Sequence, residues 1–210
     1  MNLTLDNLRR GIAAFKSRWP QEKDLHAGFY KRLQSNLTDG VTEGAWSKLV
    51  DDLSAWRALR PLSKSEAFER GLARLPLLET ARRSLIADGS ETEPSINTAK
   101  WSDAAPLYDI ARSIKGSSSP VFPSKLCHFL APRLYPVCDG EFAGTSVRGY
   151  RNFWSESRLA LISCVDLAGL QRELEAVLPG ASLDGYPWET KIIDLCCAGE
   201  QALAERQDLR

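Results

Sequence analysis

Two side chains in the middle of the sequence are of the types that covalent chemistry uses, a lysine and an aspartate. Lys125 lies in a short run that we predict to be a helix after a serine-rich turn, and Asp139 follows it by 14 residues. A deprotonated lysine amine attacks an electrophilic carbon and forms a Schiff base. A carboxylate stabilises developing positive charge or assists proton transfer. Lys125 and Asp139 have side chains capable of this chemistry, and the family resemblance given below makes them the candidate catalytic residues.

Several residues near these two have side chains that suit substrate binding. Aromatic and basic groups alternate around Tyr150, Arg151 and Trp154, a mixture that favours stacking on planar bases. Trp101 offers a further ring, and His128 follows Lys125 by three positions, near the same face of the predicted helix. His128 can tune the lysine or bind a phosphate.

Each of these residues also has a structural explanation that the sequence leaves open. Lys125 can be a surface lysine on a short helix, and Asp139 can cap the N-terminus of the next helix. His128 can be a hydrogen-bonded residue of the core. Packing between helices accounts for Tyr150 and Trp154 as well as stacking does.

The elements that must position these residues are predicted to be helices. Leu5, Leu8, Ile12, Phe15 and Trp19 recur at intervals of three and four residues, and similar apolar faces continue along the chain. No region alternates with period two, and the proline-containing residues 134–138 suit an extended loop better than a strand. We predict nine or ten helices in a compact all-α fold. Residues 1–210 form one domain in this prediction, with a subdomain boundary near the polar residues 88–97.

The balance of charge limits how the chain can bind nucleic acid. Lys and Arg number 27, Asp and Glu also number 27, and the net charge is zero. A protein held to nucleic acid by charge alone is usually basic, so binding here requires a local patch. Residues 100–158 hold eight basic and five acidic side chains, which is a small surplus of positive charge.

The cysteines and the hydropathy pattern indicate a cytoplasmic protein. The five cysteines are odd in number and form no CxxC pair, which favours reduced thiols over disulfides. Residues 1–19 carry charges throughout and do not resemble a signal peptide, and no run approaches the roughly 20 apolar residues of a membrane span. With only two histidines, we expect no metal and no cofactor. Cys127 and His128 are adjacent, so on a helix they point about 100° apart and do not suit a thiol–base pair.

The run from Lys125 to Asp139 resembles the Lys…Asp portion of the helix-hairpin-helix DNA glycosylases, over roughly forty residues. The second half of the chain also resembles bacterial proteins of unknown function that share Ser124-Lys125-Leu126-Cys127-His128-Phe129, Pro132, Pro136 and Asp139, and later Lys191-Ile192-Ile193-Asp194-Leu195-Cys196. The glycosylase resemblance implies a hairpin of two helices that grips the DNA backbone. It also implies Lys125 as nucleophile and Asp139 as electrostatic or acid/base partner. Where that family has a Gly-x-Gly turn, this chain has Val121-Phe122-Pro123-Ser124.

Three functions follow as hypotheses. The first is a DNA glycosylase/lyase-like protein that acts on damaged or modified bases in DNA repair, with DNA as its partner. The second is a non-catalytic helical module that binds nucleic acid or protein, which the zero net charge and the absent glycines favour. The third is a helical enzyme that acts on a small nucleoside-like ligand.

Overall fold

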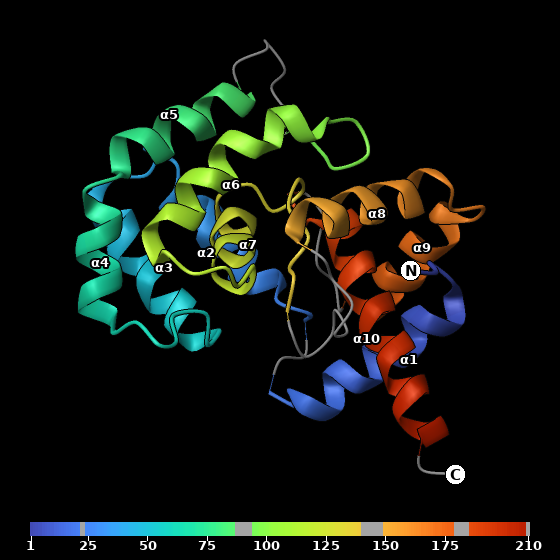
Figure 1. The fold of residues 1–210 in the computed structure, drawn as a ribbon. Coiled ribbons are helices and arrows are strands. Elements are labelled where there is room, and N and C mark those ends of the chain that lie inside the picture. The colour runs from blue at the N-terminus through green and yellow to red at the C-terminus, as the bar shows by residue number, and fades with distance from the viewer. Residues whose placement is uncertain (22–23, 87–93, 140–148, 179–184, 209–210) are drawn as a thin grey trace. The chain divides into compact units, whose positions relative to one another are not determined.

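The computed structural model describes residues 1–21, 24–86, 94–139, 149–178 and 185–208. Within these ranges the chain forms ten helices and no strand, which confirms the predicted all-α class (Figure 1). Among the described helices, none combines the length and the apolar character that a bilayer crossing requires. Residues 141–148, where a further helical pattern was expected, lie outside the described residues.

The chain divides into two compact units. The first consists of Met1–Lys31 together with Asp139–Arg210, and the second consists of Arg32–Cys138. This division does not coincide with the predicted boundary near residues 88–97. Residues 94–97 belong to the second unit, where Ile96 is fully buried and its N–H donates to the carbonyl oxygen of Arg133 at 3.0 Å. The remaining residues of that segment, up to 93, lie outside the described ranges.

The first unit is built on the close packing of its first and last helices. α1 (Leu5–Arg18) begins at Thr4, whose side chain accepts a hydrogen bond from the N–H of Asn7. It packs along α10 (Trp188–Asp208), and α8 (Tyr150–Ile162) and α9 (Leu167–Val177) also contact α10 (Figure 1). The helices approach closely because Gly11 of α1 faces the backbone of Leu195, and Gly199 of α10 faces the backbone of Asn7.

The second helix begins later than the sequence indicates. The spacing of Leu25, Phe29 and Leu33 predicts a helix from about residue 21 to 33. α2 (Ala27–Asn36) instead starts after a turn in which Leu25 and His26 have φ values of 50° and 70°. The turn is held by Asp24, whose carboxylate accepts the N–H of Gly28 at 2.8 Å. The carbonyl oxygen of Leu25 also accepts a hydrogen bond from the Tyr186 hydroxyl. α2 starts in the first unit and ends in the second.

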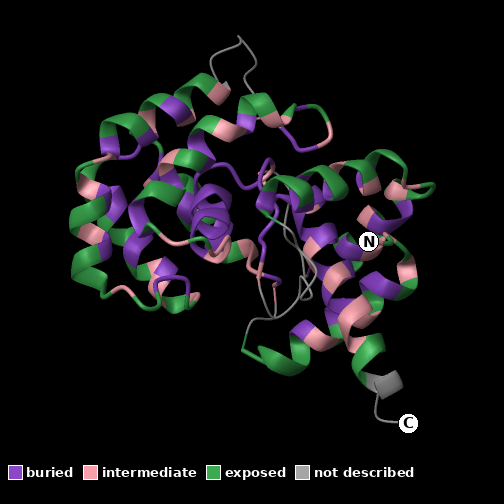
Figure 2. Ribbon diagram, viewed as in Figure 1, coloured by how far each residue is buried: buried purple, intermediate pink, exposed green. Residues whose placement is uncertain are grey.

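Besides the end of α2, the described residues of the second unit form five helices that follow one another along the chain. They are α3 (Glu43–Ala55), α4 (Lys64–Leu72), α5 (Leu75–Ile86), α6 (Trp101–Lys115) and α7 (Val121–Leu130). α4 begins with a reciprocal capping box between Ser63 and Glu66, and the Trp46 indole N–H reaches across to the carbonyl oxygen of Phe68 at 2.9 Å. α7 packs against α3 and α6 and is buried from Phe122 to Leu130 (Figure 2). The second unit is thus organised around the helix that carries the predicted nucleophile.

Candidate functional site

Two consecutive helices of the second unit carry the segment that we predicted to hold the chemistry. α6 ends at Lys115, and Gly116 follows it in the left-handed conformation with φ 68° and ψ 21°. This conformation suits glycine because a side chain there would be strained. The chain turns through the serines and resumes as α7 at Val121, where the Ser119 hydroxyl accepts the Val121 N–H. The turn brings the end of α6 close to the first residues of α7.

Lys125 lies inside the unit and not on its surface. Its side chain is only 4% exposed, and its Nζ donates a hydrogen bond of 2.9 Å to the main-chain oxygen of Trp56. Trp56 is the residue that follows the last turn of α3. Carbonyl groups at a helix C-terminus carry partial negative charge, so they attract a cation. The alternative of a surface lysine is therefore excluded for this position.

A second lysine amine reaches the same turn, and the sequence did not identify it. Lys115 is 9% exposed, and its Nζ donates to the main-chain oxygen of Ala58 at 3.0 Å, two residues after Trp56. Its Nζ also lies 5.9 Å from the centre of the Phe122 ring. Burial, and after it the positive charge of Lys125, lower the pKa of Lys115 from its ordinary value of 10.5. The two amines therefore share one small region at the end of α3.

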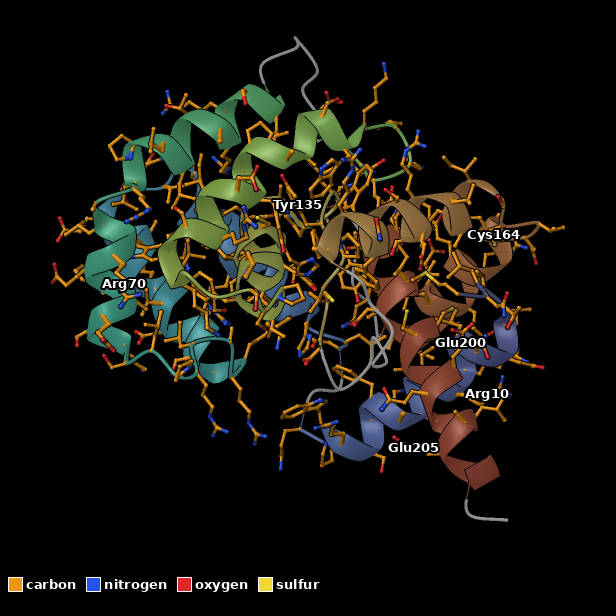
Figure 3. The ribbon with its side chains drawn as sticks, in the orientation of Figure 1. Arg10, Arg70, Tyr135, Cys164, Glu200 and Glu205 are labelled. Atoms are coloured by element: carbon orange, nitrogen blue, oxygen red, sulfur yellow. The ribbon has the colours of Figure 1, made fainter. Side chains whose placement is uncertain are left out.

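α4 holds the end of α6 in this position. Arg70, labelled in Figure 3, donates from its Nη1 to the main-chain oxygen of Lys115 at 3.4 Å. Arg74, one turn later, donates from its Nε to the Ser113 hydroxyl at 2.9 Å. Both contacts fix the last turn of α6, and with it the direction of the Lys115 side chain.

His128 is also buried, and it takes part in a structural hydrogen bond. It is 2% exposed, and its Nδ1 lies 2.7 Å from the main-chain oxygen of Tyr135. Its ring also lies beside that of Trp56, with centroids 6.3 Å apart. The Tyr135 hydroxyl in turn donates to the carbonyl oxygen of Ala104 at 2.6 Å, so this tyrosine ties the exit loop to α6 (Figure 3). These contacts agree with the structural explanation for His128, and its role in binding a substrate stays a prediction.

The loop after α7 is anchored beside the predicted nucleophile. Ser124, the neighbour of Lys125, accepts a hydrogen bond of 3.2 Å from the N–H of Cys138 through its hydroxyl oxygen. Asp139 is the next residue in the chain, and it is half-buried. The helix that Asp139 was expected to cap lies outside the described residues. Because Asp139 belongs to the first unit and Lys125 to the second, the pairing of their side chains stays a prediction.

The predicted binding residues are divided between the two units. Trp101 begins α6 in the second unit, where it is half-buried and its ring meets that of Tyr108 at 5.7 Å. Tyr150 and Trp154, in α8 of the first unit, are 3% and 2% exposed, whereas Arg151 between them is exposed. Stacking of a base on either buried ring requires that ring to be uncovered first.

The described residues contain no group of three or more histidine, cysteine or acidic side chains arranged to hold a metal ion. Burial raises the pKa of the Cys127 thiol well above its ordinary value of 9.0, so this cysteine is a poor nucleophile.

A cavity of about 420 Å³ opens in the first unit, between the N-terminal residues and the connection from α8 to α9. None of its lining residues is a predicted catalytic or substrate-binding residue.

The fold and the site define an all-α protein with two buried lysine amines at the end of one helix. No protein-family model, no curated protein and no solved structure matches the chain.

Proposed function

We propose that the chain is a DNA glycosylase/lyase-like enzyme that acts on damaged or modified bases through a lysine amine. The observation that carries this proposal is the position of Lys125, whose amine is withdrawn from water and fixed on the carbonyl oxygen of Trp56. A lysine amine that is held in a fixed position and shielded from water is a suitable nucleophile for Schiff-base chemistry.

In the proposed reaction Lys125 attacks the C1′ carbon of the deoxyribose. The bond from C1′ to the base breaks, and the base leaves with the bonding electron pair and takes up one proton of the amine. The bond from C1′ to the ring oxygen then breaks, the ring oxygen takes up the other amine proton, and a C1′=Nζ Schiff base remains. A carboxylate near C1′ stabilises the positive charge that develops there, which is the role proposed for Asp139. Support for this role comes from the hydrogen bond of Cys138 to Ser124, which anchors the chain one residue before Asp139 to the residue before Lys125.

A second candidate is a non-catalytic module that binds nucleic acid or protein. The hydrogen bond from Lys125 to Trp56 favours it, because a lysine on a helix C-terminal carbonyl is also a common stabilising contact. In this case Lys125 contributes to the stability of the second unit, and its removal affects folding and not chemistry.

The experiment that separates the two candidates is a base-release and strand-cleavage assay. Duplex oligonucleotides that carry an oxidised purine or an abasic site are incubated with the wild type, Lys125→Met, Asp139→Asn and the control Lys48→Met. Lys48 is an exposed lysine of α3 that is hydrogen-bonded to Asn36. The proposal predicts cleavage by the wild type and by Lys48→Met, at least a hundredfold less by Lys125→Met, and a smaller loss in Asp139→Asn. Binding at low salt without any cleavage supports the module instead.

A further inference from the structure

Two stretches of the second unit carry basic side chains and no acidic ones. Residues 53–65 contain three lysines or arginines and residues 110–138 contain four, whereas neither stretch contains an aspartate or a glutamate. The two stretches meet after the end of α3, where the Lys115 amine donates to the main-chain oxygen of Ala58 at 3.0 Å. A chain whose net charge is zero thus gathers positive charge in one place, and binding to nucleic acid requires such a local patch.

α4 lies beside this meeting point and adds two arginines to it. Arg70 donates from its Nη1 to the main-chain oxygen of Lys115, and Arg74, one turn later, donates to the Ser113 hydroxyl (Figure 3). Three exposed arginines and one half-buried arginine therefore surround the end of α6 and the connection from α3 to α4. We call these four residues the arginine surface: Arg57, Arg60, Arg70 and Arg74.

The arginine surface is not neutralised by ion pairs within the protein. Among the described residues no carboxylate forms an ion pair with any of its four members, whereas the nearby Lys64 pairs with Asp51 at 2.9 Å. Glu66 and Glu69 are the acidic residues of α4, and the Glu66 carboxylate already accepts the N–H and the hydroxyl of Ser63. Four positive charges against two negative ones leave a surplus that suits an anionic partner.

Arg57 has a backbone conformation that side chains rarely adopt. It follows the last turn of α3 with φ 55°, and the next N–H, that of Ala58, donates back to the carbonyl oxygen of Leu53 at 2.8 Å. Glycine is the usual residue at this position of a helix ending, because a side chain there is strained. Strain of this kind clusters at functional sites. The main-chain oxygen of Trp56, one residue earlier, accepts the hydrogen bond from Lys125, so Arg57 directly follows the contact of the proposed nucleophile.

We infer that the arginine surface binds the phosphodiester backbone of a DNA duplex and holds it at the end of α3, where the Lys125 amine also lies. Guanidinium groups suit this partner because their planar array of N–H donors matches the oxygen atoms of a phosphate. Backbone contacts position a duplex without reading its sequence, which suits an enzyme that acts on a modified base in any sequence. The inference rests on the proposed function for DNA as the partner, and it adds the surface that binds the DNA.

The test is the binding of a short, undamaged, fluorescent duplex, measured by anisotropy at several salt concentrations. We expect Arg57→Gln/Arg60→Gln to weaken binding about a hundredfold at about 50 mM salt, and to make the slope of log affinity against log salt shallower by about 2, since each phosphate contact contributes about 0.9. Arg70→Gln/Arg74→Gln is expected to have a similar effect. The control is Arg9→Gln, which removes the same charge from an exposed arginine of the first unit that pairs with Glu173. Unchanged binding by both double variants, or an equal loss in the control, overturns the inference.

Arg57→Gly separates a binding role from a structural one. Glycine relieves the strain at φ 55°, so this variant is expected to unfold at a higher temperature than the wild type. Its affinity for the duplex is expected to fall about tenfold at about 50 mM salt, because one phosphate contact is lost. Since the two effects have opposite signs, a folding defect does not explain the weaker binding. A more stable variant that binds the duplex as tightly as the wild type contradicts the inference.

The outcomes distinguish this inference from the proposed function. Weaker binding by the arginine variants, with no base release from a damaged duplex by the wild type, leaves the arginine surface standing and removes the enzyme. Base release by the wild type that all the arginine variants retain in full keeps the enzyme and rejects the surface. Polyglutamate that competes for the surface as well as DNA does, at equal charge, identifies an acidic protein as the partner and overturns the choice of DNA.

Discussion

Replacement of Gly199 by alanine tests how closely α1 and α10 pack in the first unit. A methyl group on Gly199 would overlap the carbonyl oxygen of Asn7 and would press on the N–H of Gly11. These neighbours are main-chain atoms, so no side-chain rotation relieves the overlap and the two helices must move apart. The opposing residue Gly11 faces the carbonyl oxygen of Leu195 in the same manner.

The cost follows from two opposing effects. Overpacking of a well-packed contact costs about 3 kcal/mol at the upper end of the usual range. Alanine in place of glycine inside a helix returns about 1 kcal/mol. The expected net loss is about 2 kcal/mol in the free energy of unfolding. For a unit of about 100 residues this lowers the unfolding midpoint by roughly 8–16 °C.

The assay is thermal and urea unfolding followed by circular dichroism, with hydrogen exchange to locate the change in the first unit. Gly44→Ala is the matched control, since the nearest atom to its new methyl group is the Thr42 hydroxyl at 4.0 Å. This control is expected to keep or slightly raise stability. A Gly199→Ala variant as stable as the wild type would refute the close backbone contact.

Two further predictions concern a carboxyl group and two thiols. Burial raises the pKa of the Glu79 carboxyl, but the hydrogen bond from the Val41 N–H and the neighbouring arginines outweigh burial, so the pKa is lowered from 4.5. The ionised Glu79 carboxylate therefore stabilises the fold above pH 4.5. This stabilisation is lost as the pH falls through the lower pKa of the folded state. Below about pH 4.5 the free energy of unfolding should therefore fall more steeply with decreasing pH in the wild type than in Glu79→Gln. Identical slopes for the two proteins would contradict this. Cys127 is fully buried with a raised pKa, whereas Cys164 is half-exposed. A thiol reagent should modify Cys164 well before Cys127, and the reverse order, read by peptide mass spectrometry, would refute the burial.

Local signals in the sequence predicted much of the fold. The apolar spacing of Leu8, Ile12 and Phe15 gives α1, and all three side chains are buried. Ser63, a residue type that favours helix N-caps, begins α4 in a capping box with Glu66. Such features depend on residues three or four positions apart, so a single sequence contains them in full.

The features that the sequence did not reveal depend on contacts between distant residues. Lys115 lies at the end of a predicted helix, and nothing nearby in the chain shows that its amine reaches Ala58, 57 residues away. The late start of α2 has the same origin, because the carbonyl of Leu25 is held by the hydroxyl of Tyr186. Lys125 was selected by its resemblance to a catalytic lysine, and the structure adds that it is buried.

Borohydride trapping tests the central claim, amine chemistry on DNA, most directly. The protein is incubated with a duplex that carries an abasic site, sodium borohydride is added, and the covalent adduct is resolved by denaturing electrophoresis and mapped by peptide mass spectrometry. We expect an adduct on Lys125 that is retained in Lys48→Met. An absent adduct, or one spread over exposed lysines such as Lys48, would contradict it.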